Sequence, residues 1–322
     1  MVKSALSLAL VFGCAASVGA QDYLLPTHVS APGEINISAE LRYQAGEGTL
    51  SNPSFEVDFE ETHVLGLFRF GVGIGSGFEI EASAPFEFSG TGEADESGVE
   101  FEVETAGLGD LMLEGNYLIS PMGKDAPQVL AGLVVVLPTG NDDFATPEIR
   151  VGGVEVQQGE EGGLGQGVFK IGVQFGVSQK VTGAHIYGAA RFLVSTGTQD
   201  QDDLEIDHPD VFSLLAGAMI PLGETSNLDI RLNLNYLSDE VAEDDFGDES
   251  TEEAHFNVNL EPRFYFTVGS TATIILGGSL GWQQDHAVDE EAELDLEQVF
   301  TYGVTLGLHL RLGVPLVGGA RR

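Results

Sequence analysis

The sequence is poor in cysteine, in basic residues and in long apolar runs. Its one cysteine, Cys14, excludes a disulfide framework and a metal site built from paired thiolates. Apart from a shorter run at the N-terminus, no stretch approaches the roughly 18 apolar residues that a membrane-spanning helix needs, so helical transmembrane architecture is excluded. Only 13 Lys and Arg stand against 51 Asp and Glu, which gives a formal charge of -38. A chain this acidic repels phosphate backbones, so no nucleic-acid partner is expected.

The first 20 residues, MVKSALSLALVFGCAASVGA, have the three parts of a secretory signal peptide. Lys3 precedes an apolar stretch, and small residues lead to Ala20, after which cleavage is expected. A lipoprotein acylated at Cys14 is the alternative, although the bulky Phe12 lies where a lipobox usually has a small residue. With cleavage after Ala20, residues 1-20 form a signal peptide and the mature chain leaves the cytoplasm.

Strict alternation of apolar and polar residues runs through most of the remaining chain. In residues 228–236, LDIRLNLNY, every second side chain is apolar and those between are charged or carry amides. Such alternation predicts a β-strand with two unlike faces. Twelve segments of 10 to 14 residues share it, near 34–45, 62–74, 78–88, 108–119, 128–138, 168–179, 184–194, 211–220, 228–237, 255–266, 272–282 and 299–312. Each can cross a bilayer as a tilted strand, which takes about 9 to 11 residues.

The connections between these segments alternate in length. Short ones fall at 75–77, 120–127, 181–183, 221–227 and 267–271, and long ones at 46–61, 89–107, 139–167, 195–210, 238–254 and 283–298. Tight turns on one rim and long loops on the other are typical of an up-and-down barrel. The expected fold is therefore all-β, a single up-and-down antiparallel transmembrane β-barrel of about 12 strands over 34-312. A short periplasmic segment, 21-33, precedes it, and a C-terminal tail, 313-322, follows.

Acidic residues are concentrated in the long loops. Within these loops, 38 of the 51 Asp and Glu residues and one basic residue, Arg150, lie in 47–61, 89–106, 140–166, 195–209, 238–253 and 283–297. One rim is therefore intensely acidic, and divalent cations are candidate partners there, together with outer-membrane lipid and lipopolysaccharide. The loop sequence DDFGDESTEE lacks the ligand spacing of an EF-hand, so diffuse cation association is expected and an ordered metal site is not.

Charged side chains also occupy the polar positions of the strands. If the apolar positions meet lipid, these charges line a lumen. The candidate pore-lining residues are Arg42, Arg69, Lys170, Arg191, Arg231, Arg263, Arg311, Glu40, Glu114, Asp229 and Glu261. Acid and base two residues apart on one face, as in Glu261 and Arg263, favour ion pairs across neighbouring strands. Such pairs either constrict a narrow pore and set its selectivity or plug and stiffen the barrel, and the sequence leaves both readings open.

A soluble β-sandwich is the main competing fold, with a secreted solenoid beside it. A sandwich also alternates, but its apolar face must be covered by a second sheet and its strands are usually shorter. Twelve long strands in an exported chain favour the barrel, whose apolar faces meet lipid in the cell outer membrane.

Two stretches, GLGDLMLEGNYLI from Gly107 to Ile119 and VLAGLVVVLPTGN from Val129 to Asn141, together resemble a known family. It is the outer-membrane β-barrel family named for the meta-cleavage pathway of phenol degradation. The motif residues are Gly107, Leu108, Gly109, Asp110, Pro138, Thr139, Gly140 and Asn141. The resemblance implies an outer-membrane channel for aromatic or other hydrophobic compounds. By themselves the glycines, the proline and Asp110 indicate turns at strand ends, although Asp110 can also face the lumen.

The leading hypothesis is an outer-membrane channel or transporter that passes small solutes through a narrow charged lumen, without a cofactor. A non-transporting structural or adhesive barrel that displays acidic loops is the alternative. An outer-membrane enzyme comes third. His63, His185, His255 and His309 lie at polar positions, but no nucleophile elbow, zinc-binding helix or paired Cys/His spacing accompanies them. No catalytic residue is therefore assigned.

Overall fold

The computed structural model of the chain describes residues 28–53, 55–96, 99–119, 127–141, 145–151, 153–159, 162–201, 204–244, 249–269, 271–289 and 294–313. The expected signal peptide, 1-20, and nearly all of the expected tail, 313-322, lie outside the described residues. Among the residues that are described, no helix is long and apolar enough to cross a membrane.

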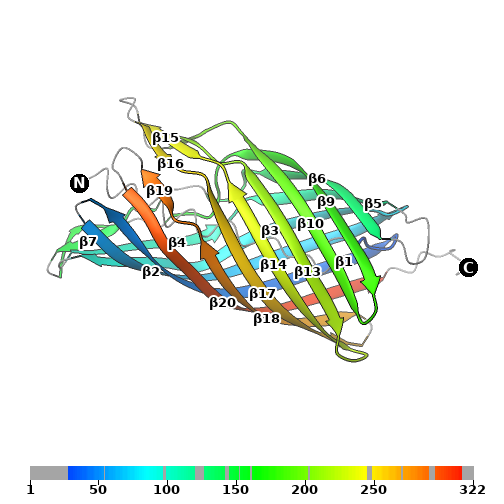
Figure 1. Ribbon diagram of the computed structural model, residues 1–322. Helices are drawn as coiled ribbons and strands as arrows, with labels where there is room; N and C mark the ends of the chain where they lie inside the picture. The colour runs from blue at the N-terminus through cyan, green and yellow to red at the C-terminus, as the bar shows by residue number, and fades with distance from the viewer. Residues whose placement is uncertain are drawn as a thin grey trace, which may run out of the picture.

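Twelve antiparallel strands close into one β-barrel (Figure 1). They are β1 (Glu34–Asn52), β2 (Phe55–Gly75), β3 (Phe78–Glu96), β5 (Leu111–Ile119), β6 (Gln128–Leu137), β9 (Phe169–Val181), β10 (Ala184–Thr196), β13 (Val211–Pro221), β14 (Ser226–Leu237), β17 (His255–Val268), β18 (Ala272–Gln283) and β20 (Leu294–Gly313). Each pairs with the next in this order, and β20 pairs with β1 to complete the ring. The all-β, up-and-down antiparallel barrel predicted from the sequence is confirmed.

Each of the twelve predicted segments overlaps one barrel strand. The alternation that predicts each strand also gives it an apolar face and a polar face. Outward-facing side chains such as Leu41, Phe68, Leu133 and Phe175 are apolar and exposed. The inward-facing set contains most of the buried charged residues. An apolar exterior and a charged interior are the arrangement of a barrel that is surrounded by lipid.

The short connections close one end of the barrel, which we call the short-turn rim. Between β2 and β3 the turn consists of Gly75, Ser76 and Gly77, all with positive φ (131°, 53° and 80°). Two glycines accommodate such a backbone without strain. The other end carries the long connections and is called the long-loop rim, the end that faces outward in outer-membrane barrels.

The prediction that the long connections are loops is wrong for much of their length. Residues 46–52 belong to β1 and residues 55–61 to β2, and the pairing of these strands continues to Asn52 and Phe55. The remaining long connections contain β4 (Val99–Leu108), β7 (Glu148–Val151), β8 (Val154–Gln157), β11 (Gln199–Gln201), β12 (Leu204–Asp207), β15 (Glu240–Asp244), β16 (Glu249–Glu252) and β19 (His286–Asp289). The barrel wall therefore rises well beyond the length needed to cross a membrane.

A small apolar core explains why these acidic segments fold as strands. Leu50, Val57 and Phe59 are buried in a cluster with Val288 of β19 and Val299 of β20. In this part of the chain the apolar residues alternate with exposed acidic ones, so one face of the extension is buried and the other is solvated. Burial of that face supplies the hydrophobic contribution that the charged residues cannot.

Candidate functional site in the barrel interior

Arg263 is at the centre of the first buried ion-pair cluster inside the barrel. Its guanidinium lies 2.9 Å from Glu261 Oε2 on the same strand, β17, and 3.2 Å from Glu40 Oε2 on β1. Arg42 of β1 lies 3.8 Å from the other oxygen of Glu261. Since β18 and β20 separate β17 from β1 in the ring, the pair between Arg263 and Glu40 spans non-adjacent strands. The two side chains therefore meet inside the barrel, unlike an ion pair between neighbouring strands, which lies along the wall.

Asp229 and Arg231 of β14 form a second buried cluster. Arg231 Nε donates to Asp229 Oδ2 at 2.6 Å, and both side chains are almost completely inaccessible to solvent. The hydroxyl of Tyr187 on β10 donates to Asp229 Oδ1 at 2.5 Å, and that of Tyr265 on β17 donates to Oδ2 at 3.2 Å. Four groups from three strands thus share one hydrogen-bond network, which offsets the cost of burying the charges.

Arg191 and Glu114 form a third cluster on the opposite part of the ring. Arg191 Nη2 lies 2.5 Å from Glu114 Oε1, although β9 and β6 separate their strands, β10 and β5. Gln174 of β9 accepts from Arg191 at 2.6 Å and donates to Glu114 at 2.7 Å. An apolar patch of Met112, Val134, Val136, Leu193 and Val211 lies at the same side of the interior, where Arg191 Nη1 is 3.0 Å from Met112 Sδ.

His63 of β2 is held between two carboxylates. Its Nδ1 lies 2.6 Å from Glu87 Oε1 and its Nε2 lies 3.5 Å from Glu61 Oε2, and all three side chains are buried. Thr105 of β4 donates to the second oxygen of Glu87 at 2.7 Å. The sequence placed His63 at a polar position but gave no sign of these partners, because Glu61 was assigned to a loop.

The structure places the predicted pore-lining residues in four different environments. Arg42, Arg191, Arg231, Arg263, Glu40, Glu114, Asp229 and Glu261 belong to the clusters described above. Lys170 is also buried, near the long-loop rim, where its Nζ donates to the carbonyl of Pro209 at 3.3 Å. Arg69 is half-buried on β2, opposite Ser38 and Ser83 in register. Arg311 lies at the short-turn rim, where its side chain is 47% exposed.

The segment before β1 lies across the short-turn rim. Ser30 is buried, and its hydroxyl donates to Glu79 Oε1 at 2.5 Å while Gly33 donates to the carbonyl of Gly73 at 2.8 Å. Nearby, Arg311 Nε lies 2.6 Å from Glu34 Oε1. Burial lowers the pKa of His28, with Arg311 as a second cause. The segment therefore packs against the barrel and narrows this end.

The motif residues that suggested a family come together at the long-loop rim. Asp110 Oδ1 accepts from the backbone N–H groups of Thr139 and Gly140 at 3.1 and 3.0 Å, and Oδ2 accepts from that of Gln166 at 2.9 Å. Asn141 donates to the carbonyl of Leu108 at 2.8 Å. Three backbone donors on one carboxylate account for Asp110 as a structural residue of the turn. Gly140 has no room for a side chain, because its Cβ would lie 2.6 Å from the carbonyl oxygen of Leu108. Gly107 has a positive φ of 128°, which favours glycine. Gly109 lies in the turn between β4 and β5, and Pro138 directly follows β6.

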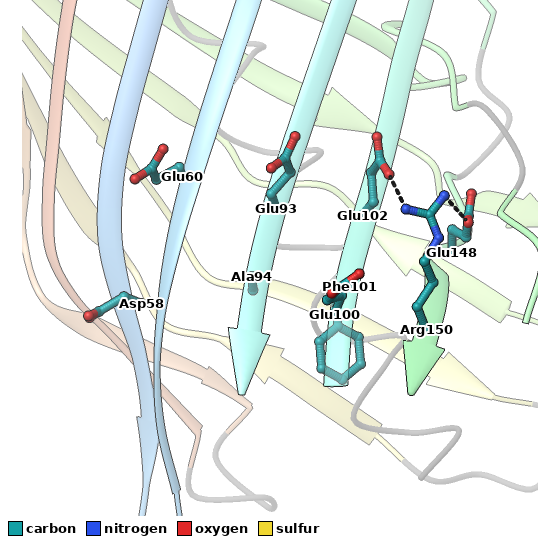
Figure 2. A pocket seen from close by; sticks show the side chains of 9 residues that line it. All are labelled: Asp58, Glu60, Glu93, Ala94, Glu100, Phe101, Glu102, Glu148 and Arg150. Atoms are coloured by element: carbon teal, nitrogen blue, oxygen red, sulfur yellow. Dashed lines mark ion pairs between the residues drawn. The ribbon is translucent and has the colours of Figure 1, made fainter. Parts of the chain in front are cut away.

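A concave acidic region lies on the extension of the wall (Figure 2). Five glutamates line this pocket of about 600 Å³, and four of them come from four adjacent strands, namely Glu60, Glu93, Glu102 and Glu148. They lie directly opposite one another in register, and Glu47 of β1 extends the series. We call these five residues the glutamate row. Arg150 is the basic residue in the pocket, 2.6 Å from Glu148 and 3.9 Å from Glu102.

A closed barrel with an apolar exterior, a charged interior and one tall acidic rim is a transmembrane β-barrel of the outer membrane. Comparison with solved structures agrees. The chain is similar to the COG4313 outer membrane channel from Pseudomonas putida F1, with a TM-score of 0.57 and 14% sequence identity over 91% of this chain and 100% of that one.

It is also similar to the transport unit of the autotransporter AIDA-I from Escherichia coli. There the TM-score is 0.57 and the identity 8%, over 95% of this chain and 98% of that one. At such identities the likeness concerns the fold alone. No protein-family model matches the sequence, and no curated protein matches it.

Proposed function

We propose that the protein is a passive outer-membrane channel for small solutes, with a lumen narrowed by ion pairs. The observation that carries the proposal is the contact between Arg263 and Glu40, which crosses the interior between non-adjacent strands. Fixed charges of both signs at a constriction select solutes by size and charge. A barrel of about twelve strands lies between small barrels filled by side chains and the open porins, so its side chains decide how much room remains.

The solute class that we propose is small hydrophobic or aromatic compounds. The interior supports it with the apolar patch around Met112 and Val134, which adjoins the Arg191 cluster. A guanidinium beside apolar side chains can interact with an aromatic ring through its π face. The motif around Asp110, which resembles the phenol-degradation family, and the fold shared with an outer membrane channel both support this assignment.

We infer that the channel has no enzymatic activity of its own. Of the histidines at polar positions, His63 has the strongest carboxylate contacts, but both ring nitrogens face carboxylates, at 2.6 and 3.5 Å. A general base needs one free nitrogen within reach of a nucleophile. His63 is therefore better suited to hold Glu61 and Glu87 in place than to transfer a proton.

Neutralising the cluster arginines tests the channel. Arg263→Gln leaves Glu40 and Glu261 without their shared cation, so the lumen becomes more negative, and we expect selectivity for cations to increase in planar bilayers. Arg231→Gln should act in the same direction. Arg150→Gln, at a half-exposed arginine outside the interior, is the matched control and should leave selectivity unchanged.

Unchanged conductance and selectivity in correctly folded Arg263→Gln and Arg231→Gln would contradict the channel. That outcome would instead support a structural or adhesive barrel that displays its acidic rim. Uptake of small aromatic compounds into liposomes then tests the solute class separately, with charged sugars of similar size as the comparison.

A further inference from the structure

Two histidines and one glutamate meet at the long-loop rim, away from the interior clusters. Glu252 is the last residue of β16, His255 the first of β17 and His286 the first of β19. All three are buried, with relative exposures of 7%, 4% and 5%. One ligand atom from each residue lies within 4.8 Å of the others.

The separation between His286 and Glu252 matches that of metal ligands. His286 Nε2 lies 3.0 Å from Glu252 Oε1, and the ring of His255 lies beside the same oxygen, with its Nδ1 at 3.5 Å. A tetrahedral zinc ion with bonds of about 2.0 to 2.1 Å holds its ligands about 3.4 Å apart. The two imidazole rings are stacked with centroids 4.0 Å apart, so small rotations of the side chains bring both rings toward one point.

Backbone hydrogen bonds fix the orientation of both rings. His286 Nδ1 lies 2.9 Å from the carbonyl oxygen of Gln284, and His255 Nδ1 lies 3.1 Å from that of Glu253. Because a carbonyl only accepts, each Nδ1 is the protonated nitrogen and the Nε2 of a neutral ring carries a lone pair. In metal sites the ligating histidine typically donates its other N–H to a carbonyl in this way.

His286 then places Nε2 3.0 Å from a carboxylate oxygen, a contact that is attractive when a positive charge lies between the two. A proton on Nε2 supplies that charge in the metal-free chain, and a divalent metal ion replaces the proton when it binds. We propose that Glu252, His255 and His286 form a binding site for a zinc-type divalent ion, with two imidazole nitrogens and one carboxylate oxygen as ligands. Calcium and magnesium fit poorly, since they take six or more oxygen ligands or keep several waters.

The site would connect segments that are distant in the sequence. Here β16 belongs to the connection that precedes barrel strand β17, while β19 belongs to the connection between β18 and β20. The backbone N–H of Glu253 already donates to the carbonyl of Ala287 across these segments at 2.8 Å. A bound ion would fasten the two extracellular segments to each other at the mouth of the barrel. This inference does not rest on the proposed solute, because metal binding is measured without any transport.

The test is zinc titration of the full mature chain, folded in detergent and stripped with a chelator. Isothermal calorimetry should show one zinc ion per chain, and cobalt(II) should give the intense visible absorption of a tetrahedral site. We expect His286→Ala and His255→Ala each to weaken binding by at least about 10- to 100-fold. Calcium at the same concentration should not compete.

His208→Ala is the matched control. His208 is buried at the same rim and its Nδ1 lies 3.0 Å from Glu240, but it is outside the cluster, so zinc affinity should not change. If an alanine variant fails to form a barrel, Glu252→Gln keeps the shape of the side chain and removes the ligand charge. Absence of stoichiometric zinc binding, or equal loss in His208→Ala, would overturn the proposal.

Discussion

Adjacent residues of β14 face two different environments. Leu232 is 48% exposed on the outer face, and Asn233 points inward, where it pairs in register with Asn259. An arginine near the middle of the lipid-facing surface costs about 2 to 4 kcal/mol, so Leu232→Arg should lower the free energy of unfolding by that amount. Asn233→Arg should cost much less. Urea unfolding in phospholipid vesicles measures both, and equal losses would argue against lipid at this face.

Asp110 has a larger structural role than its position in a turn suggests. It is the single acceptor for the backbone donors of Thr139, Gly140 and Gln166. Hydrogen bonds to a charged group each contribute about 1.5 to 3 kcal/mol, without full additivity, so Asp110→Ala should destabilise the barrel by about 3 kcal/mol. Glu56→Ala, an exposed acidic residue of β2, is the control and should be nearly neutral. A loss in Asp110→Ala no larger than that of the control would contradict this role.

At the scale of elements, the extension of β1, β2, β3, β4 and β7 carries the glutamate row (Figure 2). Like charges directly opposite one another destabilise a sheet by up to about 1 kcal/mol per pair. Glu93→Gln removes two such pairs, and it should slow amide exchange in the extension at low salt. Glu224→Gln, in a connection of the short-turn rim, is the control.

Salt provides a second test of the same repulsion. The Debye length falls from about 8 Å at 0.15 M to about 3 Å at 1 M, so sodium chloride should reproduce the effect of Glu93→Gln. Calcium should act at lower concentration because it bridges carboxylates. If salt, calcium and Glu93→Gln all leave the rate of amide exchange in the extension unchanged, the repulsion within the glutamate row is already compensated by Arg150 and the apolar core.

The sequence predicted the elements better than their ends. Alternation located all twelve barrel strands, because lipid and lumen impose opposite requirements on successive side chains. The density of acidic residues concealed that Leu50, Val57 and Phe59 continue the same alternation into segments that were interpreted as loops. The acidic residues form only the solvated face of these strands. The apolar core that stabilises the other face includes residues from β19 and β20, which are far along the chain.

At the scale of the whole molecule, the sequence could place charges on the inward face but could not group them. Glu261 and Arg263 are two residues apart, so their pairing could be predicted, whereas the reach of Arg263 to Glu40 depends on closure of the ring. The same holds for Glu252, His255 and His286. Only the topology of the rim brings β16 and β19 together, and no spacing in the chain encodes that approach.

The wall of the barrel has unequal height around its circumference. At about 3.4 Å per residue and a tilt near 45°, the 21 residues of β2 rise about 50 Å, whereas the 9 residues of β5 rise about 20 Å, close to the apolar band of about 25 Å. Antibodies and phage tail fibres that reach the cell from outside would therefore meet the tall side first. We expect epitopes to concentrate on β1 to β4, with β5 and β6 lying closer to the membrane surface.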